Sequence, residues 1–393
     1  MLAFILAPFY VLVNLYIVYW VLRWTGCCHR LCGTRAFRVL FCVVYAFAAL
    51  SPLTGFAVQE PQWLRHALKQ VGSYWLGWML YLVLAVLVVE GLLFAVRRIR
   101  KKDFQQMQRV RQVQGGVALV LVCAVCLYGM ANADRLRATD YEITLDGAGE
   151  DMTVALLADL HLGYSTEAAY IEQAVQAVNN MQADLVVIAG DIFDNEYEAI
   201  PEPGRIAAAL ASLHSTYGVY ACWGNHDVSE PILAGFTWDT ADADKDDPRM
   251  EEFLRQAGIT LLADEAVTLE NGVQLVGRKD PSRDKKLGEG RLSPEALMEP
   301  LDPARPVFVI DHQPKELDEL AAAGADLDLS GHTHDGQMFP GNLIMPLIWD
   351  NPCGCLQVGG MYSVVTSGLG VWGPDMRVGT KSEIVRITVH FAG

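Results

Sequence analysis

Five short apolar segments of the chain each end in side chains that could bind a metal ion. One of them, residues 186–189, runs into a glycine and then Asp191. The other four end in histidines accompanied by carboxylate or amide side chains: Asp159 and His161; Asn225, His226 and Asp227; Asp311 and His312; His332, His334 and Asp335. Imidazole nitrogens and carboxylate oxygens together suit first-row metals such as Mn, Fe or Zn. Each pair alone is also found in ordinary loops, so it is the recurrence that favours a metal centre.

A centre with two divalent ions would use this many ligands. Two ions about 3.5–4 Å apart can hold a phosphate between them and prepare a water molecule for in-line attack. A pair that close needs a carboxylate that reaches both ions, and Asp191 is the candidate for that position. The residues therefore point to metal-dependent hydrolysis of a phosphate ester.

Strand and helix patterns alternate from residue 154 onward. The apolar segments are expected to be buried strands, which deliver the site residues at their carboxyl ends. Between the first two strands, Thr166 is expected to cap a helix whose apolar stripe includes Ile171, Val175 and Val178. Shorter β-rich segments follow up to residue 389. This order predicts two stacked sheets flanked by helices.

The motifs Asp-x-His, Gly-Asp-x-x-Asp, Gly-Asn-His-Asp, a lone His and Gly-His-x-His occur in that order. They resemble the calcineurin-like metallophosphoesterases over residues 150–393, approximately. The resemblance implies a four-layer α/β/β/α sandwich. It also implies that one ion is held by Asp159, His161, Asp191 and His334, and the other by Asp191, Asn225, His312 and His332. His226 would contact the phosphate and protonate the leaving oxygen, with Asp227 orienting its ring.

The carboxyl-terminal motifs are similar to those of the membrane-associated branch of that family. They are the stretch from Gly331 to Gln337, residues 340–342, and residues 366–370 followed by Arg377. Two positions depart from the branch pattern. Asp335 stands where glycine is usual, and Gln313 separates His312 from a proline. Neither replaces a ligand, so activity is expected to survive.

Two further residues are candidates for supporting the site. Asp194 would hydrogen-bond to a metal ligand or to His226, or would cap a helix instead. Arg278 lies with Lys279 and Arg283 after a strand. This group would neutralise a second phosphate of the substrate, or would be a plain surface cluster.

The amino-terminal third of the chain is typical of a membrane protein. Apolar runs at about 2–22, 37–58, 75–96 and 116–133 are each long enough to cross a bilayer. No cleavage signal follows the first run, so it is expected to remain as a span. We expect a four-span module at 1–138 and a phosphoesterase domain at 139–393. Glu90 is the one acid well inside a span, and pairing or snorkelling is favoured over a transport role.

Charge orients the predicted spans. Residues 1–138 contain 15 Lys and Arg against 4 Asp and Glu, whereas residues 139–393 contain 15 against 42. Basic residues are concentrated in the first and third loops, which the positive-inside rule places in the cytoplasm. The catalytic domain is therefore expected on the extracytoplasmic side of the cell membrane. Its acidity makes nucleic acid a poor partner.

Two local features receive simpler interpretations. Cys353 and Cys355 are expected to be free, buried or partly oxidised thiols rather than a strained close bridge. The cluster at 27–32 is expected to be a juxtamembrane loop rather than a metal site. The acidic stretch 239–248 lacks the glycine and the closing glutamate of a calcium loop. It is therefore expected to be a solvated loop or a lid.

The sequence thus predicts a membrane-anchored phosphoesterase with two metal ions, acting on a phosphodiester or pyrophosphate. The membrane tether favours a lipid-linked or cell-envelope substrate. One alternative is a non-catalytic sensor or scaffold that binds a phosphorylated lipid. The other is a nucleotide phosphodiesterase facing the cytoplasm.

Overall fold

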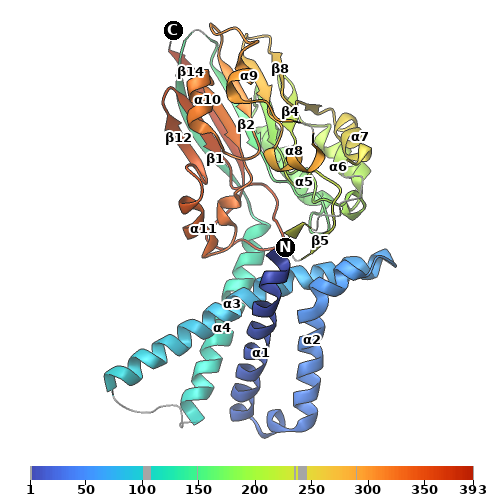
Figure 1. Cartoon of the computed structure of the whole chain (residues 1–393), viewed down its shortest axis with the longest axis vertical. Helices are drawn as coiled ribbons and strands as arrows, with labels where there is room; N and C mark the ends of the chain where they lie inside the picture. The colour runs from blue at the N-terminus through green and yellow to red at the C-terminus, as the bar shows by residue number, and fades with distance from the viewer. Residues whose placement is uncertain are drawn as a thin grey trace. The chain divides into compact units, whose positions relative to one another are not determined.

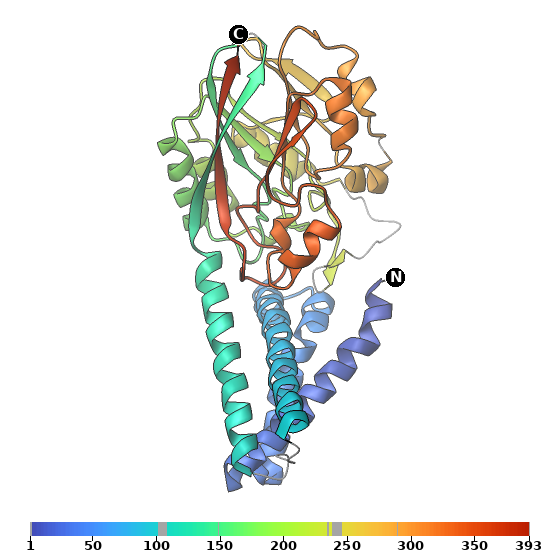
Figure 2. The same ribbon diagram turned by 90° about the vertical axis from the view of Figure 1, so that its left-hand side faces the viewer.

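A computed structural model describes residues 2–100, 108–147, 149–233, 236–237, 246–288 and 290–392 of the chain (Figures 1 and 2). Residues 239–245 of the acidic stretch and 101–107 of the third predicted loop lie outside this part. The chain forms two compact units. The first comprises residues 1–130 with the short segments 232–237 and 373–375, and the second contains the remainder.

The first unit is built from four long apolar helices. They are α1 (Leu2–Cys28), α2 (Arg35–Ala57), α3 (Gln62–Arg100) and α4 (Gln108–Ala133). All four are long and apolar enough to cross a membrane. The prediction of four membrane-length helices is confirmed, although α3 begins well before the expected residue 75. Its first turns carry polar side chains at Arg65, His66 and Lys69, so this part of the helix has no continuous apolar run.

Neutral hydrogen bonds join these helices. The hydroxyl of Tyr45 donates to Asn14 Oδ1 at 2.9 Å, and the indole of Trp75 donates to the hydroxyl of Tyr10 at 3.0 Å. Glu90 accepts from the Trp20 indole at 3.0 Å and from the Gln114 amide at 2.6 Å. The acid within the span is thus paired with neutral donors from α1 and α4.

Two six-stranded sheets form the second unit. The first has the order β1 (Leu136–Asp146), β14 (Ser382–Ala392), β2 (Met152–Leu157), β3 (Leu185–Ala189), β4 (Val219–Cys222) and β7 (Thr260–Leu261). The second has the order β12 (Gly354–Val358), β13 (Met361–Val365), β11 (Leu327–Ser330), β10 (Val307–Ile310), β9 (Gln274–Gly277) and β8 (Glu265–Thr268). Strands β2, β3 and β4 are mutually parallel, as are β9, β10, β11 and β13.

Alternation along the strands builds the layers. On β2, Val154 and Leu156 join the core between the sheets, whereas Ala155 and Leu157 pack under the outer helices. Those helices are α5 (Ala168–Asn180), α6 (Pro203–Leu210) and α7 (Pro248–Gln256). The outer face of the second sheet is covered by α9 (Pro294–Met298) and α10 (Leu317–Ala323). The predicted α/β/β/α sandwich is confirmed (Figure 1).

One strand was not expected. The strand pattern was expected to begin at residue 154, but β1 lies before it and pairs in parallel with β14 from Leu136 to Asp146. Only Ile143 and Leu145 of this strand are buried. An edge strand that buries so few of its side chains has a weak apolar signal, so its sequence resembles a loop.

Candidate metal centre

The loops that follow β2 and β11 bring together the first group of candidate ligands. The Nε2 atoms of His161 and His334 lie 3.0 Å apart, and His334 Nε2 lies 3.6 Å from Asp159 Oδ1. One ligand atom from each of these three side chains falls within 4.8 Å of the others. All three residues are buried.

A second group gathers at the ends of β3, β4, β10 and β11. His312 Nε2 lies 3.1 Å from Asp191 Oδ2, 3.1 Å from Asn225 Oδ1 and 3.1 Å from His332 Nδ1. The other nitrogen of His312 donates to the carbonyl of Ala189 at 2.9 Å. That bond places the Nδ1 proton on the carbonyl side and directs Nε2 into the group, as in metal-binding histidines.

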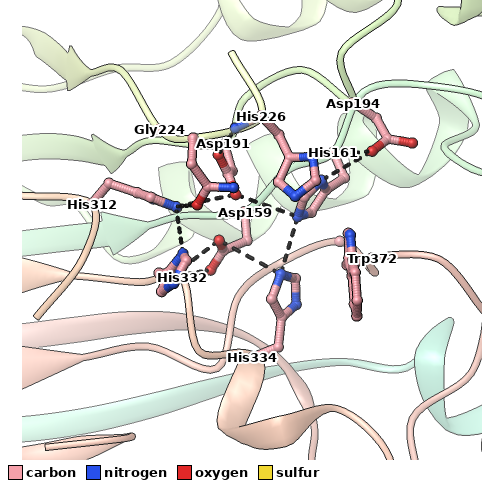
Figure 3. A network of polar contacts seen from close by, with 12 residues as sticks. Asp159, His161, Asp191, Asp194, Gly224, His226, His312, His332, His334 and Trp372 are labelled. Carbon is pink, nitrogen blue, oxygen red and sulfur yellow. Dashed lines mark hydrogen bonds and ion pairs between the residues drawn. The ribbon is translucent and has the colours of Figure 1, made fainter. Parts of the chain in front are cut away.

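Asp191 faces both groups (Figure 3). Besides its contact with His312, its Oδ2 atom lies 3.9 Å from His161 Nε2. Its Oδ1 atom accepts the backbone N–H of His226 at 2.7 Å, which holds the carboxylate in place. The residue expected to reach both ions is therefore positioned between the two clusters.

Left-handed backbone recurs among these residues. Positive φ angles are found at Asp159, His161, Asp191, His332 and His334. Such a conformation is uncommon outside glycine and is retained where surrounding structure enforces it, often at functional sites. The backbone also approaches closely: a Cβ on Gly224 would lie 2.2 Å from Asp191 Oδ1, and one on Gly331 would lie 2.4 Å from the Ala158 Cβ.

Burial perturbs the charges of the centre. Desolvation raises the pKa of Asp159 to about 6. Desolvation acts in the same direction on Asp191, but the neighbouring His312 and His226 rings outweigh it and hold its pKa well below the ordinary value. A divalent cation would compensate the negative charge of these two adjacent buried carboxylates. The carboxylates and the surrounding imidazoles also supply suitable ligand atoms, so these residues fit a metal site.

His226 stands beside the first group. Its Nδ1 donates to Asn195 Oδ1 at 2.5 Å, and its ring centroid lies 5.2 Å from that of His161. Burial lowers the pKa of His226 to about 4. The imidazole is therefore neutral at pH 7 in the protein without a ligand.

The expectation that Asp227 orients the His226 ring is wrong. Asp227 instead accepts the backbone N–H of Phe193 at 2.8 Å and that of Gly224 at 2.7 Å. With both oxygens engaged by backbone, it shapes the loop. Asn195 is the residue that contacts the ring, and sequence reasoning missed it because a lone Asn after Asp194 has no distinctive pattern.

Asp194 lies near two of the imidazoles. Its Oδ1 atom is 3.5 Å from His161 Nδ1 and 4.0 Å from His226 Nδ1. Helix capping is not its role, since the residue before α5 is Glu167 and the 3-10 turn at Tyr197–Ala199 begins after Glu196. The expected cap Thr166 is also displaced: its hydroxyl donates to the carbonyl of His161 at 2.7 Å and so braces the ligand loop.

Arg278 is fully buried, so the surface-cluster interpretation is wrong. Its guanidinium donates to Asp311 at 2.9 Å and to Glu316 at 2.9 Å. Arg291 also binds Asp311 at 2.8 Å. These pairs anchor the strand end that carries His312, which explains Asp311 as a structural residue. Arg283 is buried too, and donates to the carbonyl of Asp227 at 3.0 Å.

Two tryptophans that the motifs did not indicate flank the centre. The Trp349 ring centroid lies 5.2 Å from that of His332, and the Trp372 ring centroid lies 6.4 Å from that of His226. Lys315 Nζ lies 5.3 Å from the Trp349 ring. Elsewhere among the described residues, Cys353 and Cys355 are free thiols, and the cysteines at 27–32 form no metal-suited group.

Comparison with known proteins agrees with this geometry. Residues 152–336 match the calcineurin-like phosphoesterase family. An uncharacterized metallophosphoesterase of Helicobacter pylori is 31% identical over 255 residues, which cover 64% of this chain and 63% of that protein. The chain therefore spans less than two thirds of this relative.

Two other relatives extend the comparison. A transmembrane protein with metallophosphoesterase domain from Danio rerio is 26% identical over 397 residues, covering 94% of this chain and 86% of its own length. The UDP-2,3-diacylglucosamine pyrophosphatase of Chlamydia trachomatis is 24% identical over 220 residues, covering 48% and 64%. With four apolar helices ahead of the matched region, the chain is membrane-associated, and its residues 152–336 are similar to the calcineurin-like phosphoesterases.

Proposed function

We propose that this protein is a membrane-anchored phosphoesterase that uses two divalent metal ions to hydrolyse a phosphodiester or pyrophosphate bond. The observation that carries the proposal is the position of Asp191 between two groups of buried ligands, 3.1 Å from His312 and 3.9 Å from His161. A single-ion site would have no need of a carboxylate that faces both.

The ligand sets follow from the groups. Asp159, His161, Asp191 and His334 would hold one ion, while Asp191, Asn225, His312 and His332 would hold the other. Ions such as Mn, Fe or Zn would supply positive charge for the phosphate oxygens and make a water nucleophilic. The chain fixes these side chains with backbone bonds, including the His332 N–H on Asp159 at 3.0 Å.

His226 would protonate the leaving oxygen. Asn195 holds its Nδ1 proton, which leaves Nε2 for the substrate. Since the ring is neutral at pH 7, it must gain a proton when the substrate binds. A phosphate beside it favours that change, because nearby negative charge raises the pKa of an imidazole. Asp194, 4.0 Å away, acts in the same direction.

The membrane anchor supports a lipid-linked or cell-envelope substrate. The Chlamydia relative, a pyrophosphatase of a diacylated sugar nucleotide by name, is consistent with that class. Loop charge supports an extracytoplasmic catalytic domain. To test the side of the membrane that the catalytic domain faces, the exposed Glu150 is replaced by cysteine, and intact cells are treated with a membrane-impermeant thiol reagent. The unsubstituted protein controls for labelling of the cysteines already in the chain.

Two other functions make different predictions. A non-catalytic sensor of a phosphorylated lipid would bind without turnover, although it would have no use for a proton donor at His226. A nucleotide phosphodiesterase facing the cytoplasm would hydrolyse a nucleotide phosphodiester and would leave the introduced cysteine inaccessible from outside. Turnover by the purified protein with added Mn²⁺ separates the enzyme from the sensor.

The decisive test is Asp191→Ala. We expect hydrolysis of an aryl phosphodiester to fall by about 10³-fold or more, since charge stabilisation at the reacting phosphate is lost. The matched control is Asp318→Ala, an exposed acid on α10, which should keep wild-type turnover. Retention of most activity in the Asp191 variant would remove the mechanism.

A further inference from the structure

A ten-residue segment of the catalytic domain exposes large apolar side chains. It covers residues 339–348 and includes α11 (Gly341–Ile344) and the turn Met345–Leu347. Leu347 is 84% exposed, Ile348 63% and Leu343 62%. Phe339 and Ile344 are exposed as well. A concentration of this kind marks a surface that binds a partner or a membrane.

This apolar segment is unusual within its unit. Among the described residues from 131 to 393, the other exposed large apolar side chain is Leu292. Residues 336–349 contain no Asp, Glu, Lys or Arg, in a domain whose acidic residues greatly outnumber its basic ones. An uncharged apolar surface on an acidic domain favours a hydrocarbon partner over a charged one.

The apolar segment adjoins the metal centre. It starts five residues after His334 and ends just before Trp349, whose ring lies 5.2 Å from that of His332. The turn before it is held by Phe339, whose backbone N–H donates to the carbonyl of Val378 at 2.8 Å. The segment therefore has a fixed place beside the ligands from β11.

The loop at 377–380, which binds Phe339, also binds the last turn of α4. Asn132, within that turn, donates to the carbonyls of Arg377 at 3.0 Å and Thr380 at 2.9 Å. The Thr380 hydroxyl in turn donates to the carbonyl of Gln337 at 2.7 Å. In Figure 1, α11 and the start of β1 lie at the end of this unit away from the carboxyl terminus. The loop at 377–380 therefore binds both Phe339 of the apolar segment and the last turn of a candidate membrane helix.

We propose that residues 339–348 insert into the phospholipid bilayer that the four helices span. Because α4 is a candidate span and only residues 134 and 135 separate it from β1, the bilayer surface is within reach of Asn132 and of the loop at 377–380 that it binds. Phe339 is bonded to the same loop. Five large apolar side chains without charge suit the boundary between head groups and acyl chains. Resting on the proposed function, one consequence follows: the centre acts on phosphate at head-group depth.

Photocrosslinking of the full-length protein tests the insertion. Benzoylphenylalanine is placed at Leu347, at Ile348 or, as the matched control, at Leu292, and each protein is reconstituted in phosphatidylcholine nanodiscs. We expect illumination to add the mass of one phospholipid at 347 and 348 and none at 292. Phosphatidylcholine has no net charge, so a lipid adduct there reports apolar contact.

Two outcomes overturn the proposal. An unmodified mass at both 347 and 348 means that the segment faces water. A protein–protein adduct means that a second copy of the chain covers it. Neither result depends on hydrolysis, so the proposal fails or survives separately from the enzymatic function.

Turnover tests the consequence for substrate. We expect Leu347→Asp to lose most of its hydrolysis of a nitrophenyl phosphodiester carried on diacylglycerol in the bilayer, relative to its hydrolysis of a water-soluble nitrophenyl phosphodiester. Leu292→Asp should keep the wild-type ratio. An unchanged ratio in the Leu347 variant contradicts a role in presenting lipid. If the unsubstituted protein cleaves neither probe, the proposed phosphodiester hydrolysis is contradicted, and the adducts still decide the insertion.

Discussion

The two units of this protein bury polar groups in opposite ways. The helical unit pairs neutral side chains, such as Tyr45 with Asn14 and Trp75 with Tyr10. The catalytic domain instead buries carboxylates beside imidazoles at its strand ends, as at Asp191 and His312. A neutral hydrogen bond needs only its partner, whereas a buried charge costs much more unless it is compensated.

This difference distinguishes polar groups that hold the fold together from polar groups that are available for chemistry. In the described part of the helical unit, the polar contacts named above join neighbouring helices, and Glu90 is the one ionisable acid among them. In the catalytic domain Asp159 and Asp191 lie together on left-handed backbone, an arrangement costly to the fold by itself. Such a cost is consistent with selection for a function, here the binding of cations.

The largest effect should come from removing one ligand of either group. His332→Ala and His334→Ala should each lose one of the two proposed ions and reduce aryl phosphodiester hydrolysis by about 10²–10³-fold. Elemental analysis of the purified proteins measures the loss. The control is His214→Ala, an exposed histidine whose removal should change neither quantity. Loss of both ions in both variants would show that the groups are not separate sites.

A smaller loss is expected from the residue that holds His226. Asn195→Ala removes the acceptor for the Nδ1 proton, so kcat should fall by about 10–100-fold while metal content stays intact. Asn195→Asp keeps an acceptor and adds negative charge, which raises the pKa of His226. Its pH–rate profile should therefore extend to higher pH, and a profile identical to wild type would contradict the pairing.

The free-energy cost of an uncompensated buried charge can be measured at Asp328. Burial, reinforced by Asp311, raises the pKa of this carboxyl to about 7, and Ser330 and Ser363 donate to it. Between about pH 4 and 7 the unfolded chain releases this proton and the folded chain keeps it, so wild-type stability falls as pH rises. Asp328→Asn removes that loss.

The stability advantage of the Asp328→Asn variant over wild type should grow through this window, reaching on the order of a few kcal/mol above about pH 7. Thermal unfolding of both proteins at about pH 5 and pH 8 measures the growth. An advantage equal at the two pH values would mean that the carboxyl is not protonated in the fold.

The smallest effect is expected at Glu90. Glu90→Gln keeps an oxygen that accepts from Trp20 and Gln114, so both stability and turnover should stay close to wild type. Glu90→Leu removes the acceptor and should cost about 1 kcal/mol of stability. Thermal unfolding and the aryl phosphodiester assay check both. A large activity loss in Glu90→Gln would contradict a purely structural role for this acid.

Much of the centre could be predicted because its signals are local. A run of apolar residues ending in Asp159 and His161, or in His332 and His334, reveals a buried strand with polar side chains at its end. The four membrane-length helices were readable for the same reason, since twenty apolar residues are a local property. The sequence pattern did not predict burial where the compensating partner is distant along the chain. Arg278 is buried because it pairs with Asp311, which lies 33 positions away.

Periodicity and spacing along the chain were enough to predict the types and order of the candidate ligands, the four membrane-length helices and the layered α/β fold, because each is a local property. The three-dimensional arrangement was needed to show that Asn195 rather than Asp227 contacts His226 and that residues 136–146 form an edge strand. It was also needed to show that an apolar segment lies beside the metal centre and is bonded to the loop that binds Asn132. Those outcomes depend on which backbone groups occupy each side chain's hydrogen-bonding atoms in space, and no local pattern records that.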